Sequence, residues 1–257
     1  MRRVPVIAVF NQKGGVGKTT TTFNIGAALA PKYPQSLLVD VDPQSSLTLA
    51  IGARNVSAAS SLYAFFKDAT PLAQLVQTQP SGLRLIAASL DLSKVEALHG
   101  SDAAISRRLK EGIEGSLVPG NSPILIDCCP MLGVLSLNAL IAASHVLLPV
   151  SADYLSLEGA AKLQSALDVL EQRLDKHFVR RVVTTRFDAR RRLSFEIYRR
   201  LQERFGTSLC ETVITESVSL AESPMHHKGI FAYAPGSQGA VDYAALTEEL
   251  EAGNFFS

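Results

Sequence analysis

The chain has 257 residues, of which 47% are hydrophobic and 19% charged, and its formal net charge is +1. This composition excludes a disordered protein, because it can supply a sizeable core, and the small net charge does not by itself indicate a nucleic-acid partner. Three cysteines do not form a disulfide framework and indicate a reducing compartment. The start lacks a signal-peptide pattern. No stretch approaches the ~20 apolar residues of a membrane span, so we expect a cytoplasmic protein.

Five short apolar runs lack the alternation of a half-exposed strand. Uninterrupted apolar runs are typical of strands that are buried on both faces of a parallel sheet. The predicted strands are Val4–Phe10, Ser36–Val41, Pro123–Cys129, His145–Val150 and Val179–Thr185. The stretch from Gly52 to about Pro80 is the least regular, and we expect it to cover one edge of the sheet.

Helical patterns lie between these runs. Leucines 163, 167, 170 and 174 recur at helical spacing, as do Ile197, Leu201 and Phe205, and Gly206 then predicts a helix end. Alternating strands and helices predict a doubly wound α/β fold with a mostly parallel sheet and helices on both faces. We expect residues 1–257 to form one domain, with no room for a helix-turn-helix module before the first strand.

The sequence "NQKGGVGKTT", from Asn11 to Thr20, follows the first predicted strand. A loop that runs from a buried strand into a helix directs backbone N–H groups and the helix dipole at one point, which makes an anion site. Its glycines, Gly14, Gly15 and Gly17, allow close approach to phosphates. Lys18 is placed to reach the β and γ phosphates, and the Thr19 hydroxyl suits Mg²⁺.

Lys13 is unusual because the loop already has a phosphate lysine in Lys18. One interpretation is an ordinary solvated lysine. The other is that Lys13, at the entrance of the loop and directed away from it, serves a nucleotide bound by a second copy of the chain. Two subunits would then meet face to face with nucleotide between them.

Three aspartates stand at or just beyond the ends of apolar strands: Asp40, Asp42 and Asp127. In an open parallel sheet, ligands bind at this edge. Carboxylates there can position Mg²⁺ through water or orient a water that attacks the γ-phosphate. A single aspartate at a strand end is more often a turn or cap residue, but three beside a phosphate loop favour a functional site.

The segment "KGGVGKTTT" (Lys13–Thr21) resembles the deviant Walker A motif of the ParA/MinD group of P-loop ATPases. "LLVDVDPQSSLT" (Leu37–Thr48) resembles their Walker A′ segment, and "ILIDCCP" (Ile124–Pro130) their Walker B strand. The similarity continues through "TRFDARRRLS" and "GSQGAVDYAALTEEL". Within this group, the chain resembles in particular the short Soj-like ParA partition ATPases. Walker B departs from the common D-x-P-P, because Cys129 replaces the first proline and Met131 follows Pro130.

The resemblance implies ATP and Mg²⁺ as cofactors and an ATP-dependent homodimer. It also implies that Lys13 crosses to the phosphates of the partner, that Asp42 orients the attacking water, that Asp127 holds Mg²⁺ through water, and that Asp40 supports both. The implied nucleotide-binding residues are Gly14, Gly15, Val16, Gly17, Lys18, Thr19 and Thr20. Hydrolysis is slow in this family, and a partner protein stimulates it, so hydrolysis acts as a timer for the dimer.

Residues 178–205 contain nine arginines and three acidic residues, a net charge of +6, so the rest of the chain carries −5. This asymmetry is typical of a face that binds nucleic acid. Part of the cluster has a simpler interpretation as i,i+4 pairs on a solvated helix, Glu196 with Arg200 and Arg199 with Glu203. That interpretation leaves out Arg180–Arg181 and Arg190–Arg192.

Relatives in this family have a DNA-binding arginine near the position of Arg190, but Glu216 and Ser219 stand where they carry further arginines. The sequence therefore leaves two readings open, non-specific DNA binding through Arg190, Arg191, Arg192 and Lys228, or no DNA binding. With DNA binding, the protein would be nucleoid-associated.

Other sites are less well supported. Adjacent Cys128 and Cys129 do not match the cluster-ligand spacing of nitrogenase-reductase relatives, and we interpret them as small buried residues. His226 and His227 are interpreted as part of a solvated loop rather than a ligand pair.

The sequence is compatible with three alternative functions. The first is an ATP-switched protein that binds DNA and positions or segregates a cargo, with hydrolysis triggered by a ParB-like or other adaptor. The second is a MinD-like membrane-associated regulator, which the acidic ending "LTEELEAGNFFS" disfavours because such proteins end in a basic amphipathic helix. The third is a metabolic P-loop ATPase or ligase. We expect no membrane partner.

Overall fold

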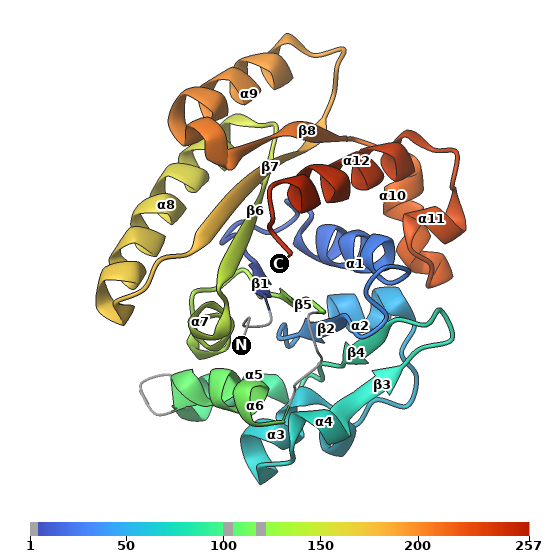
Figure 1. The fold of residues 1–257 in the computed structure, drawn as a ribbon, viewed down its shortest axis with the longest axis vertical. Helices are drawn as coiled ribbons and strands as arrows, with labels where there is room; N and C mark the ends of the chain where they lie inside the picture. Colours follow the sequence, from blue (N-terminus) through green and yellow to red (C-terminus); the bar gives the residue numbers. More distant parts are fainter. Residues whose placement is uncertain (1–4, 100–104, 117–121, 257) are drawn as a thin grey trace.

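One eight-stranded sheet forms the centre of the computed structural model, which describes residues 5–99, 105–116 and 122–256 (Figure 1). The strand order is β3-β4-β2-β5-β1-β6-β7-β8; β3 and β4 are antiparallel and the other neighbours are parallel. The strands are β1 (Val6–Val9), β2 (Leu37–Asp40), β3 (Val76–Thr78), β4 (Arg84–Ile86), β5 (Ile124–Asp127), β6 (His145–Ser151), β7 (Val179–Phe187) and β8 (Leu209–Thr215).

Helices cover both faces of this sheet because alternate residues of the central strands point to opposite sides. Val6 and Ala8 of β1 pack with α3 to α9, whereas Ile7 and Val9 pack with α1, α2 and α10 to α12. The helices are α1 (Lys18–Leu29), α2 (Ser46–Ile51), α3 (Leu62–Asp68), α4 (Leu72–Leu75), α5 (Leu92–His99), α6 (Arg108–Ser116), α7 (Val134–Ala142), α8 (Tyr154–Leu174), α9 (Arg192–Phe205), α10 (Val218–Glu222), α11 (Ile230–Tyr233) and α12 (Gln238–Ala252). The 3₁₀ turns are η1 (Ala58–Ser60), η2 (Ile105–Arg107), η3 (Gly206–Ser208) and η4 (Ser223–His226).

The predicted doubly wound, mostly parallel fold is confirmed, and all five predicted strands are present as β1, β2, β5, β6 and β7. Val4, where the first was predicted to begin, lies outside the described residues. The predicted helix end is also confirmed, since Gly206 follows α9 with a φ of 52°. Across the described ranges, no helix is both long and apolar enough to cross a bilayer.

The expectation for Gly52 to Pro80 was wrong in its detail. Instead of an irregular cover, this stretch contains η1, α3, α4 and β3. β3 is itself the edge strand of the sheet. Its three residues, Val76, Gln77 and Thr78, are too few and too mixed in polarity to give a strand pattern in the sequence.

The other edge strand, β8, is sealed by carboxylates of α12. The backbone N–H groups of Glu211 and Thr212 donate to Glu249 at 2.9 and 2.8 Å, and that of Thr215 donates to Asp242 at 2.7 Å. Arg181 from β7 pairs with the same Glu249 at 2.9 Å. Side chains thus take up N–H groups that an unpaired edge would present to another strand.

The parallel topology brings the carboxyl ends of β1, β2 and β5 together. β5 lies between β1 and β2, and Asp40 of β2 is level with Asp127 of β5. The loop from Phe10 to Gly17 leaves β1 at the same edge. The fold therefore assembles the predicted loop and aspartates in one place, as the general rule for such sheets requires.

Candidate functional site

The loop between β1 and α1 is built for close backbone approach. Gly15 and Gly17 have φ values of 74° and 90°, in the left-handed region that glycine tolerates best. Added Cβ atoms at Gly14 and Gly15 would meet nothing within 4 Å, so the space above them is open. Gly17 stands directly before the first turn of α1, where N–H groups and the helix dipole favour an anion.

Contacts with distant strands hold this loop in place. The Asn11 amide donates to the Pro149 carbonyl at 2.7 Å, and its oxygen accepts the Lys13 N–H at 2.9 Å. Thr185 of β7 donates its hydroxyl to the carbonyl of Val16 at 2.8 Å. Sequence reasoning missed Asn11 and Thr185, because their partners lie more than a hundred residues away along the chain.

Lys18 lies almost fully buried at the start of α1. Its Nζ donates to the carbonyl of Lys13 at 3.0 Å and so spans the loop from one end to the other. Burial lowers the pKa of Lys18, although the nearby Asp127 carboxylate opposes that shift. A partly desolvated ammonium inside a glycine-rich loop attracts phosphate oxygens strongly, since little water screens it.

Thr19 and Asp127 form a pair of oxygen donors beside the loop. The Thr19 hydroxyl donates to Asp127 Oδ2 at 2.7 Å, and the Thr22 hydroxyl lies 3.3 Å from Oδ1. Burial, followed by the charge of Asp40, raises the pKa of Asp127 well above its usual range. A buried carboxylate next to a hydroxyl is a donor set that suits a hard cation such as Mg²⁺, whose charge would offset the cost of burying the carboxylate.

Asp40 is fully buried and organises the segment that carries Asp42. Its carboxylate accepts the Thr48 N–H at 2.9 Å, the Thr48 hydroxyl at 2.7 Å and the Asp42 N–H at 3.1 Å. Burial raises the pKa of Asp40 to about 6, and these hydrogen bonds oppose the rise. The structure thus places Asp40 as an anchor of the β2–α2 connection.

Asp42 lies at the start of that connection, and it is more exposed than Asp40. Its carboxylate accepts the N–H of Gln44 at 2.9 Å, as the first residue of a turn often does. Ser45, with a φ of 56°, then leads into α2. The turn holds Asp42 at the carboxyl end of β2 and leaves a second carboxylate oxygen for another ligand.

Lys13 is directed away from its own loop. Its Nζ lies 2.7 Å from Asp153 Oδ1 and 2.8 Å from Ser156 Oγ, at the start of α8. Partial burial opposes the charge of Asp153, but hydrogen bonds from Lys13, Ser151 and Ser156 outweigh it and lower the pKa of Asp153 to about 2. The side chain of Lys13 is 34% exposed and that of Asp153 43%, so the pair is partly open to solvent.

A depression of about 210 Å³ lies beside this pair, lined by charges of both signs from distant parts of the chain. Arg186 of β7 pairs there with Glu216 at 2.8 Å. The backbone φ of Arg186 is 52°, which is unusual for a residue other than glycine. In the sequence, Glu216 stands out only because relatives carry an arginine at its position. In the structure its carboxylate instead neutralises Arg186 next to the loop.

The predicted DNA-binding arginines lie on the connection between β7 and α9. Arg190 and Arg191 both pair with Asp188, at 2.9 and 3.1 Å, yet their side chains remain 88% and 68% exposed. Hydrogen bonds from Arg190 lower the pKa of Asp188 to about 2. Arg192 begins α9 and is exposed. The three arginines form a solvent-facing group with one counter-charge.

Lys228 belongs to a different part of the chain, just after η4, where it is exposed. The histidines before it have local contacts: His226 stacks on Tyr233, and His227 lies 3.0 Å from the carbonyl of Leu49. These contacts hold the turn in place.

Other charged residues of the basic cluster are paired within the fold. Arg180 and Arg181 do have ion-pair partners: Arg180 pairs with Asp168 and Glu171, and Arg181 with Glu249, so both belong to the folded framework. The predicted helical pairs, Glu196 with Arg200 and Arg199 with Glu203, are confirmed.

All three cysteines are buried. Burial raises the pKa of Cys128 well above its usual range and that of Cys210 to about 12, so both thiols stay protonated. Cys129 lies 3.0 Å from the hydroxyl of Ser136, which also donates to the carbonyl of Met131 at 2.7 Å. This network ties the segment after Asp127 to α7.

Together, a glycine loop between a central strand and a helix, a buried lysine, and a Thr–Asp oxygen pair at the carboxyl edge of a parallel sheet define a P-loop nucleotide site. A family profile described as an AAA domain matches residues 4–179. The sporulation initiation inhibitor protein Soj of Bacillus subtilis is 34% identical over 96% of this chain and 98% of its own. The chromosome partitioning protein ParA of Caulobacter vibrioides is 34% identical over 95% and 93%. The chain therefore belongs to the ParA/MinD-type P-loop ATPases.

The fold is shared with solved structures. Cobyrinic acid a,c-diamide synthase from Mycobacterium smegmatis, solved with bound ADP and magnesium, has a TM-score of 0.81 and 27% identity, covering 96% of this chain and 93% of that one. This similarity supports the P-loop ATPase fold over nearly the whole chain.

Proposed function

We propose that the chain binds ATP with Mg²⁺, forms a sandwich homodimer around the nucleotide, holds non-specific DNA in that state and so positions or segregates a cargo. An adaptor protein then triggers hydrolysis and release. The observation that carries this proposal is the position of Lys13, which is turned out of its own loop and held at the protein surface by Asp153 and Ser156. A surface-held lysine beside a phosphate site can move to the phosphates of a second copy.

The proposal gives the other residues roles that are compatible with their positions. Lys18 and the N–H groups from Gly14 to Thr20 bind the phosphates, and Thr19 with Asp127 holds Mg²⁺, the latter through water. Mg²⁺, when bound, neutralises charge that develops on the phosphates. Asp42 orients the attacking water from its turn, and Asp40 keeps that turn in place.

DNA binding is assigned to Arg190, Arg191 and Arg192, with Lys228 as a further contact. Exposed cations that are only partly neutralised suit phosphate-backbone binding without sequence preference. Relatives named for chromosome partitioning support the same biology. A nucleoid-associated protein is the expected outcome.

Sedimentation velocity and gel shifts of long DNA test this proposal. With ATP and Mg²⁺, Asp42→Ala should accumulate as a dimer that retains DNA at low salt, because it binds ATP without hydrolysing it. Lys18→Ala should remain a monomer that does not bind DNA. An Asp42→Ala protein that binds ATP yet stays monomeric would refute the dimer, and a dimer that ignores DNA would refute the DNA-binding part.

One observation favours a second function. The similarity to a structure named as a diamide synthase is compatible with an ATP-dependent ligase. ATP hydrolysis that requires a small carboxylic acid, in the absence of DNA and adaptor, would support this alternative.

A further inference from the structure

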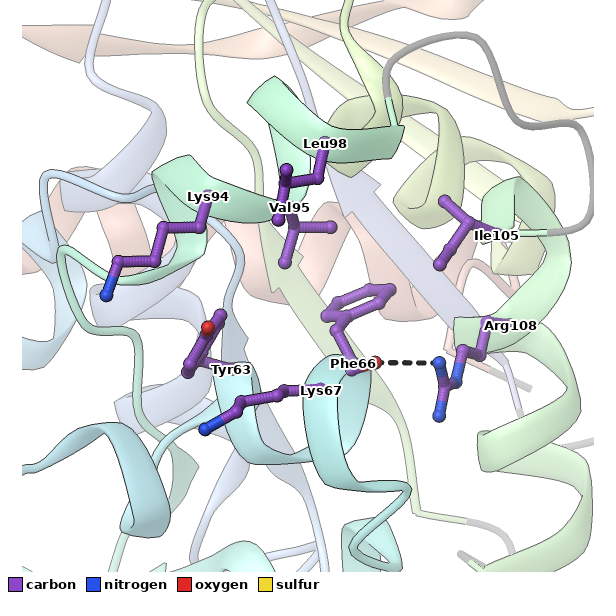
Figure 2. A pocket seen from close by; sticks show the side chains of 8 residues that line it. All are labelled: Tyr63, Phe66, Lys67, Lys94, Val95, Leu98, Ile105 and Arg108. Atoms are coloured by element: carbon purple, nitrogen blue, oxygen red, sulfur yellow. Dashed lines mark hydrogen bonds between the residues drawn. The ribbon is translucent and has the colours of Figure 1, made fainter.

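A second pocket, of about 250 Å³, lies between α3, α5 and the start of α6, formed by residues that the nucleotide site does not use (Figure 2). Phe66, Val95 and Ile105 form its apolar floor, and all three are buried. Leu98 stands at the rim and is 75% exposed. The floor is therefore a fixed part of the core, whereas Leu98 offers apolar surface to a partner.

Cations surround this floor. Lys67 and Lys94 flank the ring of Tyr63, with their Nζ atoms 5.9 and 5.7 Å from its centroid, and Figure 2 shows Arg108 on the other side of the pocket. Arg108 is held in place because it donates to the carbonyl of Phe66 at 2.7 Å. The eight lining residues include these three cations and no acid.

One of these cations has a counter-charge at the surface. Lys94 pairs with Asp91 at 2.6 Å, but the lysine is 58% exposed, and exposed pairs of this kind contribute little to stability. The pocket thus combines an apolar centre with a positive rim.

α5 also connects this pocket to the nucleotide site. Glu96, next to Val95 in the chain, accepts the N–H groups of Val134 and Leu135 at 3.0 and 2.9 Å. Those residues begin α7, immediately after the segment that follows Asp127. A Cβ added at Gly133 would overlap the Glu96 carboxylate, so a larger residue there would displace that side chain from its present position.

The connection continues through Ser136 in the first turns of α7. Its hydroxyl donates to the carbonyl of Met131 at 2.7 Å and lies 3.2 Å from that of Cys129. A shift of α5 would therefore be transmitted through Glu96 and α7 to the segment that follows Asp127.

From this arrangement, we infer that the pocket is a docking site for an acidic peptide segment of a partner protein, anchored by one aromatic or aliphatic side chain, and that docking is felt at Asp127 through Glu96. The identification of that partner as the adaptor rests on the proposed function. A nucleic-acid backbone fits less well, because it would leave the apolar floor and Leu98 without a partner.

Binding can be tested without nucleotide, so the result does not depend on whether the protein dimerises. The probes are fluorescein-labelled synthetic peptides of equal length: one glutamate-rich with a central phenylalanine, one with serine for the phenylalanine, one with lysine for the glutamates. A DNA duplex is the fourth probe. Fluorescence anisotropy should show that the wild-type protein prefers the first peptide.

Two variants locate the binding. Lys67→Glu with Lys94→Glu should weaken the first peptide about tenfold or more by reversing the rim charge, and Leu98→Ser should weaken it less. The matched control is Lys32→Glu with Lys162→Glu. It makes the same change in net charge at two exposed lysines away from the pocket, Lys32 near α12 and Lys162 on α8, and it should bind the first peptide like the wild type. Four outcomes would overturn the docking site. Two concern the wild-type protein, which would bind none of the peptides, or would bind the serine peptide as tightly as the first one. In the other two, the control variant loses as much affinity as the rim variant, or the duplex binds preferentially to the same residues.

Hydrogen exchange tests the coupling. Binding of the first peptide should change exchange of residues 128–136 in the wild-type protein but not in Glu96→Gln, which keeps a similar shape and should still bind the peptide. If both proteins respond alike, or if neither does while the peptide is bound, the route through Glu96 is wrong. An intact ATP dimer together with no peptide binding would reject this docking site and leave the proposed function standing.

Discussion

At the scale of residues, Lys13 and its two partners at the start of α8 define what changes in the dimer that we propose. In that dimer Lys13 leaves Asp153 and Ser156 to reach the second copy, while Lys18 remains buried in the loop. The two lysines are therefore separable by mutation.

Lys13→Ala should bind ATP with nearly normal affinity but fail to dimerise with ATP and Mg²⁺, because the loop contacts of Lys18 remain while the cross-subunit contact is lost. Calorimetry gives the affinity and sedimentation velocity the oligomeric state. Lys32→Ala, which removes an exposed lysine paired with Glu251, should dimerise normally. A Lys13→Ala protein that still forms the ATP dimer would contradict the assigned role.

The pKa of Asp153 predicts a pH dependence. Its folded value of about 2 lies below the ordinary 3.8, so the folded state binds fewer protons than the unfolded state between these values. Its contribution to stability is present above about pH 4 and is lost as the pH falls toward 2.

Asp153→Asn should therefore lower the free energy of unfolding near neutral pH, and its difference from the wild type should shrink as the pH falls below about 4. Urea unfolding at several pH values measures this. Asp68→Asn, at the exposed last residue of α3, serves as the control. A difference that stays constant down to pH 3 would mean that the Lys13–Asp153 pair does not contribute as charges.

Sequence reasoning found the loop, the two lysines and the three aspartates because each belongs to a local pattern. It did not find Asn11, Thr185, Asp153 or Glu96. Their roles depend on partners brought close by the sheet and by helix packing, and no local spacing encodes those partners. Asp153 left one weak signal, a polar residue just before a helical pattern, which is typical of a helix cap.

At the scale of elements, the connection from β2 to α2 depends on Thr48. Its hydroxyl donates to the buried Asp40 carboxylate and accepts the N–H of Ala88 at 2.9 Å, so it joins the connection to the end of β4. Asp42 is carried on this connection.

Thr48→Val should destabilise the protein by about 1–3 kcal/mol, because it leaves a buried N–H and a buried carboxylate each short of a partner. The pKa of Asp40 is about 6, and its ionised form depends most on the hydrogen bond from the Thr48 hydroxyl. The loss of stability should therefore be larger at pH 8, where Asp40 is ionised, than at pH 5. Urea unfolding at both pH values measures it, and Thr207→Val, at an exposed position, is the control. An equal cost at the two pH values would contradict the assigned role of the ionised carboxylate.

Four of the five strands predicted from sequence are buried along their whole length, and the fifth, β7, is buried in its middle, so their apolar runs give a clear pattern. β3, β4 and β8 were missed. β3 and β4 have three residues each, and β8, "LCETVIT", mixes polar and apolar side chains because it lies at an edge. Their place in the sheet comes from tertiary contacts rather than from a pattern of their own.

At the scale of the whole molecule, the arginines divide into framework and surface. Arg180 and Arg181 are tied to α8 and α12, whereas Arg190, Arg191 and Arg192 face solvent. The charge asymmetry seen in the sequence therefore overstates the surface available to DNA.

Changing Arg190, Arg191 and Arg192 together to glutamine should make the plot of log affinity for DNA against log salt less steep, by up to about 2 to 3 in slope, because up to three phosphate contacts are lost. ATP binding should be unchanged. The control, Arg199, Arg200 and Arg204 changed to glutamine, removes equal charge from the exposed face of α9. Anisotropy titrations over a salt series measure both. Equal slopes for the two variants would show that overall charge, not this group, governs binding.

The sealed edge of β8 also restricts how copies of this protein can polymerise. Since Glu249 and Asp242 already accept three of its backbone N–H groups, a neighbouring chain cannot extend the sheet there without first displacing α12. Cross-β fibres growing from that side would need partial unfolding as their first step.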